Sequence, residues 1–220
     1  MYDDGYMLNK YLQKPEKIYV HENDLPDWVQ KGKLVAIDTE AMGLKIGRDR
    51  LCLVQLTFDG SECHLVQFSS TSNYYGAKNL INILEDPAIT KIFHFARFDV
   101  AILFDAFGIL TQNIYCTKIA SKLTRTYTER HGLKTICSEL LGVEISKKEQ
   151  SSDWGKKALS DEQKVYAAMD VLYLHVLKEK FDEILERECR MPIAQECFKF
   201  LPYLAQLDCL GWSESIFAHI

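Results

Sequence analysis

Two acidic residues follow a run of apolar residues in the segment LVAIDTEAMGL, residues 34–44. Successive side chains of an extended chain alternate between its two faces, so Asp38 and Glu40 share one face and Thr39 takes the other. Two carboxylates about 5 Å apart repel by roughly 1 kcal/mol in water and by roughly 3 kcal/mol at an effective dielectric near 20. The pair either marks the place where a strand leaves the core, or it binds a divalent cation with carboxylates from elsewhere in the chain.

A third acid lies near the start of a predicted helix in FHFARFDVAIL, residues 93–103. Asp99 follows a short strand-like run and precedes apolar residues at 100–104. An acid in the first turn of a helix is stabilised by the helix dipole, which would explain Asp99 without any further role. The alternative is that Asp99 joins the acid pair at 38 and 40.

A tyrosine and an acid stand four residues apart in KVYAAMDVLYLHVL, residues 164–177. Asp170 lies among apolar residues, where an ionised side chain needs a partner. On a helix, Tyr166 and Asp170 lie one turn apart on the same face. They could bond only to each other, or they could face the other three acids.

The elements that must position these residues follow from apolar periodicity and from Gly, Pro and capping signals. Strands are predicted at 18–20, 34–40, 50–58, 62–68, 91–95 and 113–116. Helices are predicted at 24–31, 79–86, 96–107, 117–123, 132–142, 160–188 and 192–207, and loops at 69–76 and 143–159. Asp59-Gly60 is a hairpin signal, and Ser160 with Gln163 is a capping-box pattern. This order indicates an α/β fold with a mixed sheet of five to six strands flanked by helices.

The three groups of residues, taken in order, resemble the motifs of the DEDD superfamily of 3′-to-5′ exonucleases. The four-residue spacing from Tyr166 to Asp170 is similar to the tyrosine-bearing branch of that superfamily. Further runs are similar to the nanoRNase C group of ribonuclease D-like enzymes, from about residue 34 to the end: IDTEAMGL, RDRLCLVQL, TKIFHFARFD, CTKIASKLTRTYTERHGLK, QSSDW, YAAMDVLYLH and CFKFLP. The resemblance implies a ribonuclease H-like exonuclease fold. We then expect residues 1–17 to be an accessory or disordered tail and residues 18–220 to form one exonuclease domain with a C-terminal helical segment.

The resemblance also implies a reaction and its cofactors. The expected activity is 3′-to-5′ hydrolysis of very short single-stranded oligoribonucleotides, especially dinucleotides, to nucleoside 5′-monophosphates. The four carboxylates, with a charge of −4, suit two Mg²⁺ or Mn²⁺ ions, which prefer oxygen ligands: Asp38, Glu40, Asp99 and Asp170. Two such ions activate a water and stabilise the leaving 3′ oxygen. Tyr166 is expected to orient the attacking water, because a phenol with a reference pKa of about 10 is a weak general base at neutral pH.

Several further residues are candidates for substrate binding. Leu44 resembles the apolar wedge that related exonucleases press between two bases, and its alternative is an ordinary core leucine. His94 is a candidate contact, although a hydrogen-bonded structural role is the alternative. Residues 118–134 contain five Lys or Arg and one Glu, and this loop could cap the 5′ phosphate of a dinucleotide through Arg125, Tyr127, Arg130, His131 and Lys134. The alternative for each residue of the loop is a solvated surface charge.

Two other functions compete with the dinucleotide hypothesis. One is a broader ribonuclease D-like exonuclease that trims longer RNA or DNA ends. The other is an inactive nuclease fold that serves as a nucleic-acid-binding scaffold. The net charge of −5 argues against general coating of long nucleic acid and leaves a short substrate open.

Length, composition and cysteine content predict the class of protein and its cellular compartment. The chain has 220 residues, 47% hydrophobic and 26% charged, which is ample for one soluble domain. Its seven cysteines never form a CxxC pair, which favours free thiols in a reducing cytoplasm. The start lacks a signal-peptide pattern and no long apolar run is present, so we expect a cytoplasmic protein without a membrane partner. The resemblance to the nanoRNase C group implies self-association into a ring, expected to be an octamer.

Overall fold

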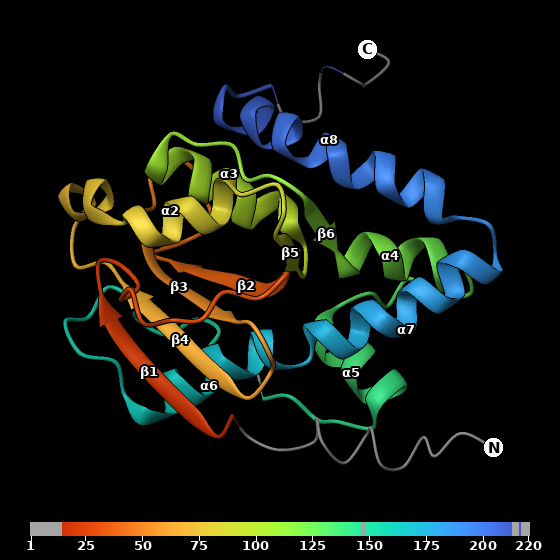
Figure 1. The fold of residues 1–220 in the computed structure, drawn as a ribbon, viewed down its shortest axis with the longest axis horizontal. Coiled ribbons are helices and arrows are strands. Elements are labelled where there is room, and N and C mark those ends of the chain that lie inside the picture. Colours follow the sequence, from red (N-terminus) through yellow and green to blue (C-terminus); the bar gives the residue numbers. More distant parts are fainter. Residues whose placement is uncertain (1–14, 147, 213–215, 217–220) are drawn as a thin grey trace.

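The structure, a computed structural model, describes residues 15–146, 148–212 and 216. Most of the predicted tail at 1–17 therefore lies outside the described residues. A six-stranded mixed sheet forms the centre of the fold, with helices on both faces (Figure 1). All seven cysteines are free thiols, as the sequence predicted. Among the described residues, no helix has both the length and the apolar character that crossing a membrane requires.

The strands lie in the order β1-β4-β3-β2-β5-β6 across the sheet. Their bounds are Lys17–Glu22 for β1, Leu34–Ala41 for β2, Leu51–Thr57 for β3, Glu62–Gln67 for β4, Thr90–Phe93 for β5 and Ile114–Cys116 for β6. β2, β3 and β4 form an antiparallel meander, whereas β1 runs parallel to β4, and β2, β5 and β6 run parallel to one another. All six predicted strands are confirmed. The carboxyl ends of β2, β5 and β6 consequently meet at one edge of the sheet.

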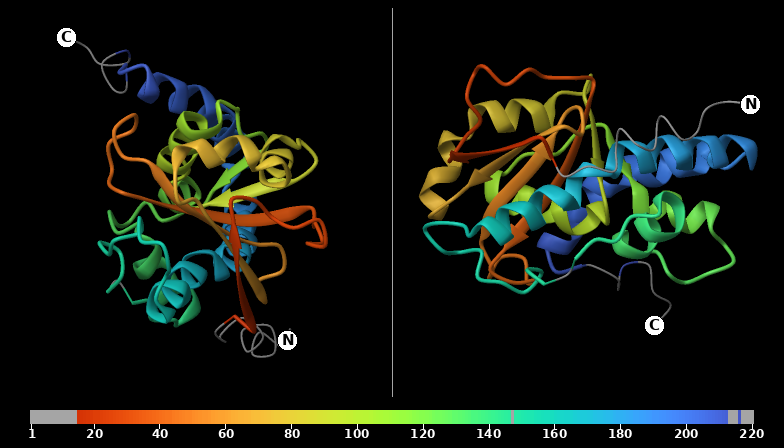
Figure 2. Two further views of the ribbon diagram at one scale, coloured as in Figure 1. Left: turned by 90° about the vertical axis from the view of Figure 1, so that its left-hand side faces the viewer. Right: turned by 90° about the horizontal axis from the view of Figure 1, so that it is seen from below.

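Seven α-helices and one 3₁₀ helix are described around the sheet. Their bounds are Thr71–Gly76 for η1, Lys78–Glu85 for α2, Ala96–Phe107 for α3, Thr117–Thr124 for α4, Leu133–Leu141 for α5, Asp161–Leu172 for α6, Leu174–Arg187 for α7 and Met191–Cys209 for α8. α2 and α3 cover one face of the sheet, and α6 packs on the other face against β2, β3 and β4 (Figure 2). α8 lies across α3, and α7 lies against α4.

Two local predictions were wrong, and in both segments side chains form hydrogen bonds with distant parts of the chain. Residues 24–31 form turns instead of a helix, and the Asp24 carboxylate accepts hydrogen bonds from the backbone N–H groups of Asn79 and Leu80 at 2.9 Å. Asp24 thus caps the start of α2, which satisfies N–H groups that a helix leaves unpaired. The predicted loop at 69–76 contains η1, where the buried Tyr74 hydroxyl donates to the Leu51 carbonyl at 2.7 Å.

The long helix predicted at 160–188 is two helices, α6 and α7, separated at Tyr173. The capping box of Ser160 and Gln163 is present, as the sequence predicted. Tyr173 is 2% exposed, with φ −95° and ψ −4°, and its N–H bonds to the Val171 carbonyl instead of the carbonyl one turn back. The break follows from packing, because α6 faces the sheet while α7 faces α4.

Candidate active site

The end of β2 and the last turn of α6 bring three carboxylates together. Asp38, Glu40 and Asp170 each offer one oxygen atom, and these oxygens lie within 4.8 Å of one another. Asp38 and Glu40 share a face of β2, and a register shift in the β2–β3 pairing lies between Glu40 and Ala41. Residues 132 positions apart in sequence therefore meet at the sheet edge where β2 ends.

Asp99 approaches the same place from the first turn of α3. Its side chain is 3% exposed, and Oδ1 accepts a hydrogen bond from the Thr39 hydroxyl at 2.8 Å. Asp99 is outside the group of three, but its charge raises the pKa values of Asp38 and Glu40. The four acids therefore form one electrostatic unit.

The pKa values of these acids are raised because the carboxylates are removed from water. Burial is the main cause in each case, and repulsion by the other acids adds to it for Asp38 and Glu40. The pKa of Glu40 rises to about 9, and the pKa values of Asp99 and Asp170 rise to about 7. Asp38 has a pKa well above its ordinary range. Four acids that repel one another in a desolvated site need positive charge nearby.

No side chain in the part of the chain that the structure describes supplies that charge by an ion pair. Among the described residues, no Lys, Arg or His forms a salt bridge with any of the four acids. A clustered set of carboxylate oxygens with unbalanced charge matches the ligand preference of hard divalent cations. The residues present therefore fit a metal of the Mg²⁺ or Mn²⁺ type.

Tyr166 lies one turn before Asp170 on α6, as the spacing predicted. Its pKa is raised by burial and by the charges of Asp170 and Glu40. The phenol therefore keeps its proton at neutral pH. Its ring lies 6.0 Å from that of Trp154, which is 2% exposed and packs beside it.

Two residues at the site were not anticipated from the sequence. Gln55 lies opposite Asp38 in the β2–β3 register and donates from Nε2 to Asp38 Oδ2 at 2.6 Å. Thr39, on the opposite face of β2, holds Asp99. Gln55 is fully buried in the apolar run LCLVQLT, and an amide in such a run is the sequence signal that could have drawn attention to it.

The predicted wedge residue, Leu44, lies in the loop that follows β2. Its side chain is 84% exposed, so the alternative of an ordinary core leucine is wrong. An exposed leucine just beyond the acid pair agrees with the wedge hypothesis, which stays a prediction.

His94 occupies a structural position at the end of β5. Its Nδ1 lies 2.9 Å from the Thr117 hydroxyl, which donates to the Phe93 carbonyl at 3.1 Å. Burial and the charge of Lys118 lower the pKa of His94 to about 3, so the ring is neutral. These contacts join the ends of β5 and β6 and favour the structural alternative for His94.

The basic loop does not lie on the surface as a whole, so the alternative of a solvated surface charge is wrong for two of its residues. Arg125 is 2% exposed and donates to Glu139 and to the Arg130 carbonyl. His131 is 6% exposed and bonds to the Ser121 hydroxyl at 2.9 Å. Arg125 and His131 stabilise the loop because they bond to the Arg130 carbonyl and the Ser121 hydroxyl, which lie inside its turn. They are therefore not solvated surface charges, and their contact with a 5′ phosphate stays a prediction.

The other three residues of the loop remain accessible. Tyr127 is 76% exposed. Arg130 and Lys134 have mostly or partly exposed side chains, with only 4.0 Å contacts to Glu139 and Glu144. Such exposed pairs contribute little to stability, so these side chains are available to a ligand.

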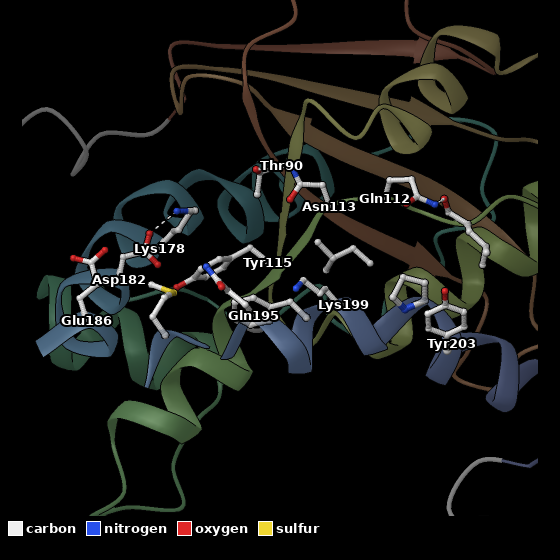
Figure 3. Close-up of a pocket in the computed structure, with 15 residues that line it drawn as sticks. Thr90, Gln112, Asn113, Tyr115, Lys178, Asp182, Glu186, Gln195, Lys199 and Tyr203 are labelled. Carbon is white, nitrogen blue, oxygen red and sulfur yellow. Dashed lines mark hydrogen bonds and ion pairs between the residues drawn. The ribbon is translucent and has the colours of Figure 1, made fainter. Parts of the chain in front are cut away.

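A cavity of about 850 Å³ lies elsewhere, between β6, α7 and α8 (Figure 3). Tyr115, Lys178, Asp182 and Tyr203 are among its lining residues, and none of the four clustered acids is. The candidate active site is therefore the group of carboxylates at the sheet edge, and this cavity is separate from it.

Comparison with known proteins agrees with this geometry. The chain is 55% identical to NrnC of Brucella melitensis in a structure bound to pGG, with a TM-score of 0.87 over 93% of this chain and 99% of the other. It is 54% identical to the same protein with bound Mg²⁺, with a TM-score of 0.84 over 93% and 100% of the two chains. These matches confirm the predicted ribonuclease H-like α/β fold.

Comparison of sequences also identifies exonucleases as relatives of this chain. Ribonuclease D of Granulibacter bethesdensis is 33% identical over 162 residues, which cover 74% of this chain and 40% of the relative. Ribonuclease D of Escherichia coli is 31% identical over 164 residues, covering 74% and 42%. The chain thus spans about two fifths of the length of these relatives. Residues 18–186 match the model of the 3′-5′ exonuclease domain, which is more than half of the chain, and the chain therefore belongs to this family of 3′-5′ exonucleases.

Proposed function

We propose that this protein is a metal-dependent 3′-to-5′ exoribonuclease that degrades very short oligonucleotides, especially dinucleotides, to nucleoside 5′-monophosphates. The observation that carries the proposal is the convergence of Asp38, Glu40 and Asp170 at the end of β2, with Asp99 and Tyr166 beside them. Hydrolysis of a phosphodiester needs positive charge at the phosphate and an oriented water, and this donor set serves both needs.

The carboxylates of Asp38, Glu40, Asp99 and Asp170 would hold two divalent cations, Mg²⁺ or Mn²⁺. Bound there, the cations supply Lewis acidity toward the scissile phosphate and lower the pKa of a coordinated water. Support comes from the unbalanced charge of the four acids and from the Mg²⁺ bound in the structure of Brucella melitensis NrnC.

The chain's own residues prepare the site for this reaction. Gln55 fixes the orientation of Asp38, and Thr39 fixes that of Asp99, which keeps the ligand oxygens in place without conformational search. Tyr166 keeps its proton because burial and neighbouring acids raise its pKa. Its hydroxyl is therefore suited to orient the attacking water and not to deprotonate it.

The preference for short substrates rests on different support. The net charge of −5 disfavours long-range attraction of a polyanion. Leu44 is exposed beside the acids, where it can separate two bases, and Arg130, Tyr127 and Lys134 are accessible to the 5′ phosphate. The similar NrnC structure bound to pGG holds a short ligand of this class.

A broader activity on longer RNA or DNA ends is the second candidate, because ribonuclease D relatives match 74% of the chain. The inactive-scaffold hypothesis is disfavoured, since all four acids and the tyrosine are present and converge.

A time course on 5′-labelled RNAs of two to seven residues with Mg²⁺ tests the proposal. We expect the dinucleotide to be consumed fastest and the Asp38→Asn protein to be inactive while remaining folded. Equal rates at every length would support the broader exonuclease, and absence of nucleoside 5′-monophosphate with every substrate would refute exonuclease activity itself. A matching DNA series separates ribose from deoxyribose preference.

A further inference from the structure

Phe95 adopts a backbone conformation that bulky residues rarely take. It precedes the first residue of α3 with φ 66° and ψ 46°, in the left-handed region that favours glycine and asparagine. Its side chain is 46% exposed, so burial of the ring does not compensate the strain. Strained residues persist where the surrounding structure fixes them, and they concentrate at functional sites.

A lysine covers the ring of Phe95. Lys118 Nζ lies 4.0 Å from the centroid of the ring, which is a cation–π contact. Within the part of the chain that the structure describes, Lys118 forms no ion pair. A half-exposed aromatic ring and an unpaired ammonium group therefore stand together.

Topology places this pair beside the four acids. Phe95 follows β5 by two residues and Lys118 follows β6 by two, while the acid pair lies at the end of β2. These strands are parallel, so all three ends lie at the same sheet edge, where Figure 1 shows β5, β6 and α4 side by side. The hydrogen bond between His94 and Thr117 links the two segments directly, and Asp99 follows Phe95 by one helical turn.

We propose that Phe95 and Lys118 form a substrate-positioning pair, in which the ring stacks on a nucleobase and the ammonium group meets a phosphate of a short oligonucleotide. The proposal rests on the exonuclease function proposed above. A base stacks on an aromatic face regardless of its identity, and a lysine meets a phosphate as a point charge, so the pair would bind without selecting sequence. The strained backbone keeps the ring at the strand end instead of letting it fold into the core.

Steady-state kinetics of a dinucleotide with Phe95→Asn tests the ring. Asparagine accepts the left-handed conformation, so the backbone should be retained and the melting temperature should not fall. Loss of one stacked base predicts a KM higher by about five- to a hundredfold with a smaller change in kcat, following the ~1–3 kcal/mol of such stacks. Phe95→Tyr keeps a ring and should restore the KM. An unchanged KM for Phe95→Asn would overturn the proposal.

Lys118→Gln tests the ammonium group, with Lys122→Gln as the matched control one turn later on the exposed side of α4. We expect a higher KM and a weaker dependence of the KM on salt for Lys118→Gln only, because one phosphate contact is lost. Lys118→Arg should restore both. Equal effects of the two Gln variants would show that only the general charge of α4 matters, which would overturn the role of Lys118.

A binding experiment separates this proposal from the proposed function. The Asp170→Asn protein and its Phe95→Asn double variant are titrated with a dinucleotide that carries 2-aminopurine, whose fluorescence reports stacking. We expect quenching with the single variant and at least a fivefold weaker affinity with the double variant. If the wild-type protein hydrolyses no oligonucleotide yet the two affinities differ as expected, the exonuclease proposal fails and the positioning pair stands. Hydrolysis by the wild type with equal affinities would refute the pair alone.

Discussion

At the scale of single residues, the site depends on side chains that do not themselves carry the chemistry. Asp38 and Asp99 each accept a hydrogen bond from a buried donor, Gln55 and Thr39 respectively. Such partners hold a ligand oxygen in one orientation and typically affect metal affinity or activity by 10–100-fold. The donors matter because four repelling carboxylates would otherwise turn away from one another.

Replacement of Gln55 by leucine should separate orientation from folding. Leucine fits the buried run of β3 and also removes the amide oxygen of Gln55, which has no hydrogen-bond partner among residues 15–146, 148–212 and 216. We therefore expect stability within about 1 kcal/mol of the wild type and a loss of about ten- to a hundredfold in Mg²⁺ affinity or turnover. Titration calorimetry with Mg²⁺ and steady-state kinetics measure the two effects, and unaltered values in both would remove Gln55 from the site.

Replacement of Tyr166 by phenylalanine should leave the metal site intact and remove most turnover. The ring would still pack beside Trp154, while the hydroxyl that orients water is lost. Mg²⁺ affinity and kcat are the two readouts. Retained kcat would exclude Tyr166 from the mechanism, and lost metal affinity would instead assign it to the metal site.

At the scale of elements, the ends of β2, α3 and α6 are held together against electrostatic repulsion. The pKa values of the four acids are raised, to about 7 for Asp99 and Asp170 and to about 9 for Glu40. A group with a raised pKa in the folded state binds more protons there than in the unfolded chain, so stability falls as pH rises. In the absence of metal, this contribution is fully present below about pH 4 and is lost through about pH 7 to 9.

The thermal stability of the protein should therefore depend on pH and metal together. With a chelator, we expect the melting temperature to fall between pH 5 and pH 8, and the increase caused by Mg²⁺ to be larger at pH 8. Scanning fluorimetry at both pH values measures this. Asp170→Asn removes one acid and should reduce the fall. An equal effect of Mg²⁺ at both pH values would contradict the assignment of these acids as its ligands.

The loop between α4 and α5 depends on Arg125, which is buried where the sequence indicated a surface residue. Arg125→Met leaves the Arg130 carbonyl without its side-chain donor and removes the buried ion-pair partner of Glu139. We expect a loss of about 1–3 kcal/mol in the free energy of unfolding, measured by urea titration, with little change in KM for the folded enzyme. Arg130→Met is the matched control, with a side chain 73% exposed, and should change stability by less than about 0.5 kcal/mol. A raised KM with unchanged stability for Arg125→Met would instead support its predicted role in substrate binding.

At the scale of the whole molecule, apolar side chains gather on the surface near the C-terminal end of the described residues. Ile193, Tyr203, Leu210 and Trp212 are all more than half exposed, on α8 or just beyond it. Exposed apolar residues concentrated on one element are typical of protein–protein contacts. This agrees with the self-association into a ring that the resemblance to the nanoRNase C group implies, which stays a prediction, with an octamer as the expected size.

Light scattering of the purified protein tests the assembly. We expect a mass that is a multiple of 25.4 kDa, with eight subunits as the predicted number, and Tyr203→Asp should lower it by placing a charge in the contact. The Lys199→Gln variant on the same helix changes the net charge by the same one unit and controls for charge alone. A monomeric wild-type protein would refute the ring, whereas a closed assembly of another size would correct only the number.

The sequence by itself determined the strands, most helices and the order of the functional acids. These features depend on short-range signals: the apolar run before Asp38, the Gly108 that ends α3, and the four-residue spacing of Tyr166 and Asp170 on one helical face. Such signals act within a few residues, so they can be recognised in the sequence without knowledge of the fold. Local signals alone left each acid with a purely structural explanation. The resemblance to the exonuclease motifs was needed to predict that the four acids form one site.

Only the tertiary structure decided which side chains from distant segments face one another. The β2–β3 register places Gln55 opposite Asp38. The packing of α7 on α4 divides the predicted long helix at Tyr173. Asp24 caps α2, whereas the sequence predicted a helix beginning at Asp24 itself. Burial of Arg125 likewise required α5 to bring Glu139 to it. Each outcome depends on contacts between residues far apart in the chain, whose free energies exceed local propensities, and no local pattern encodes them.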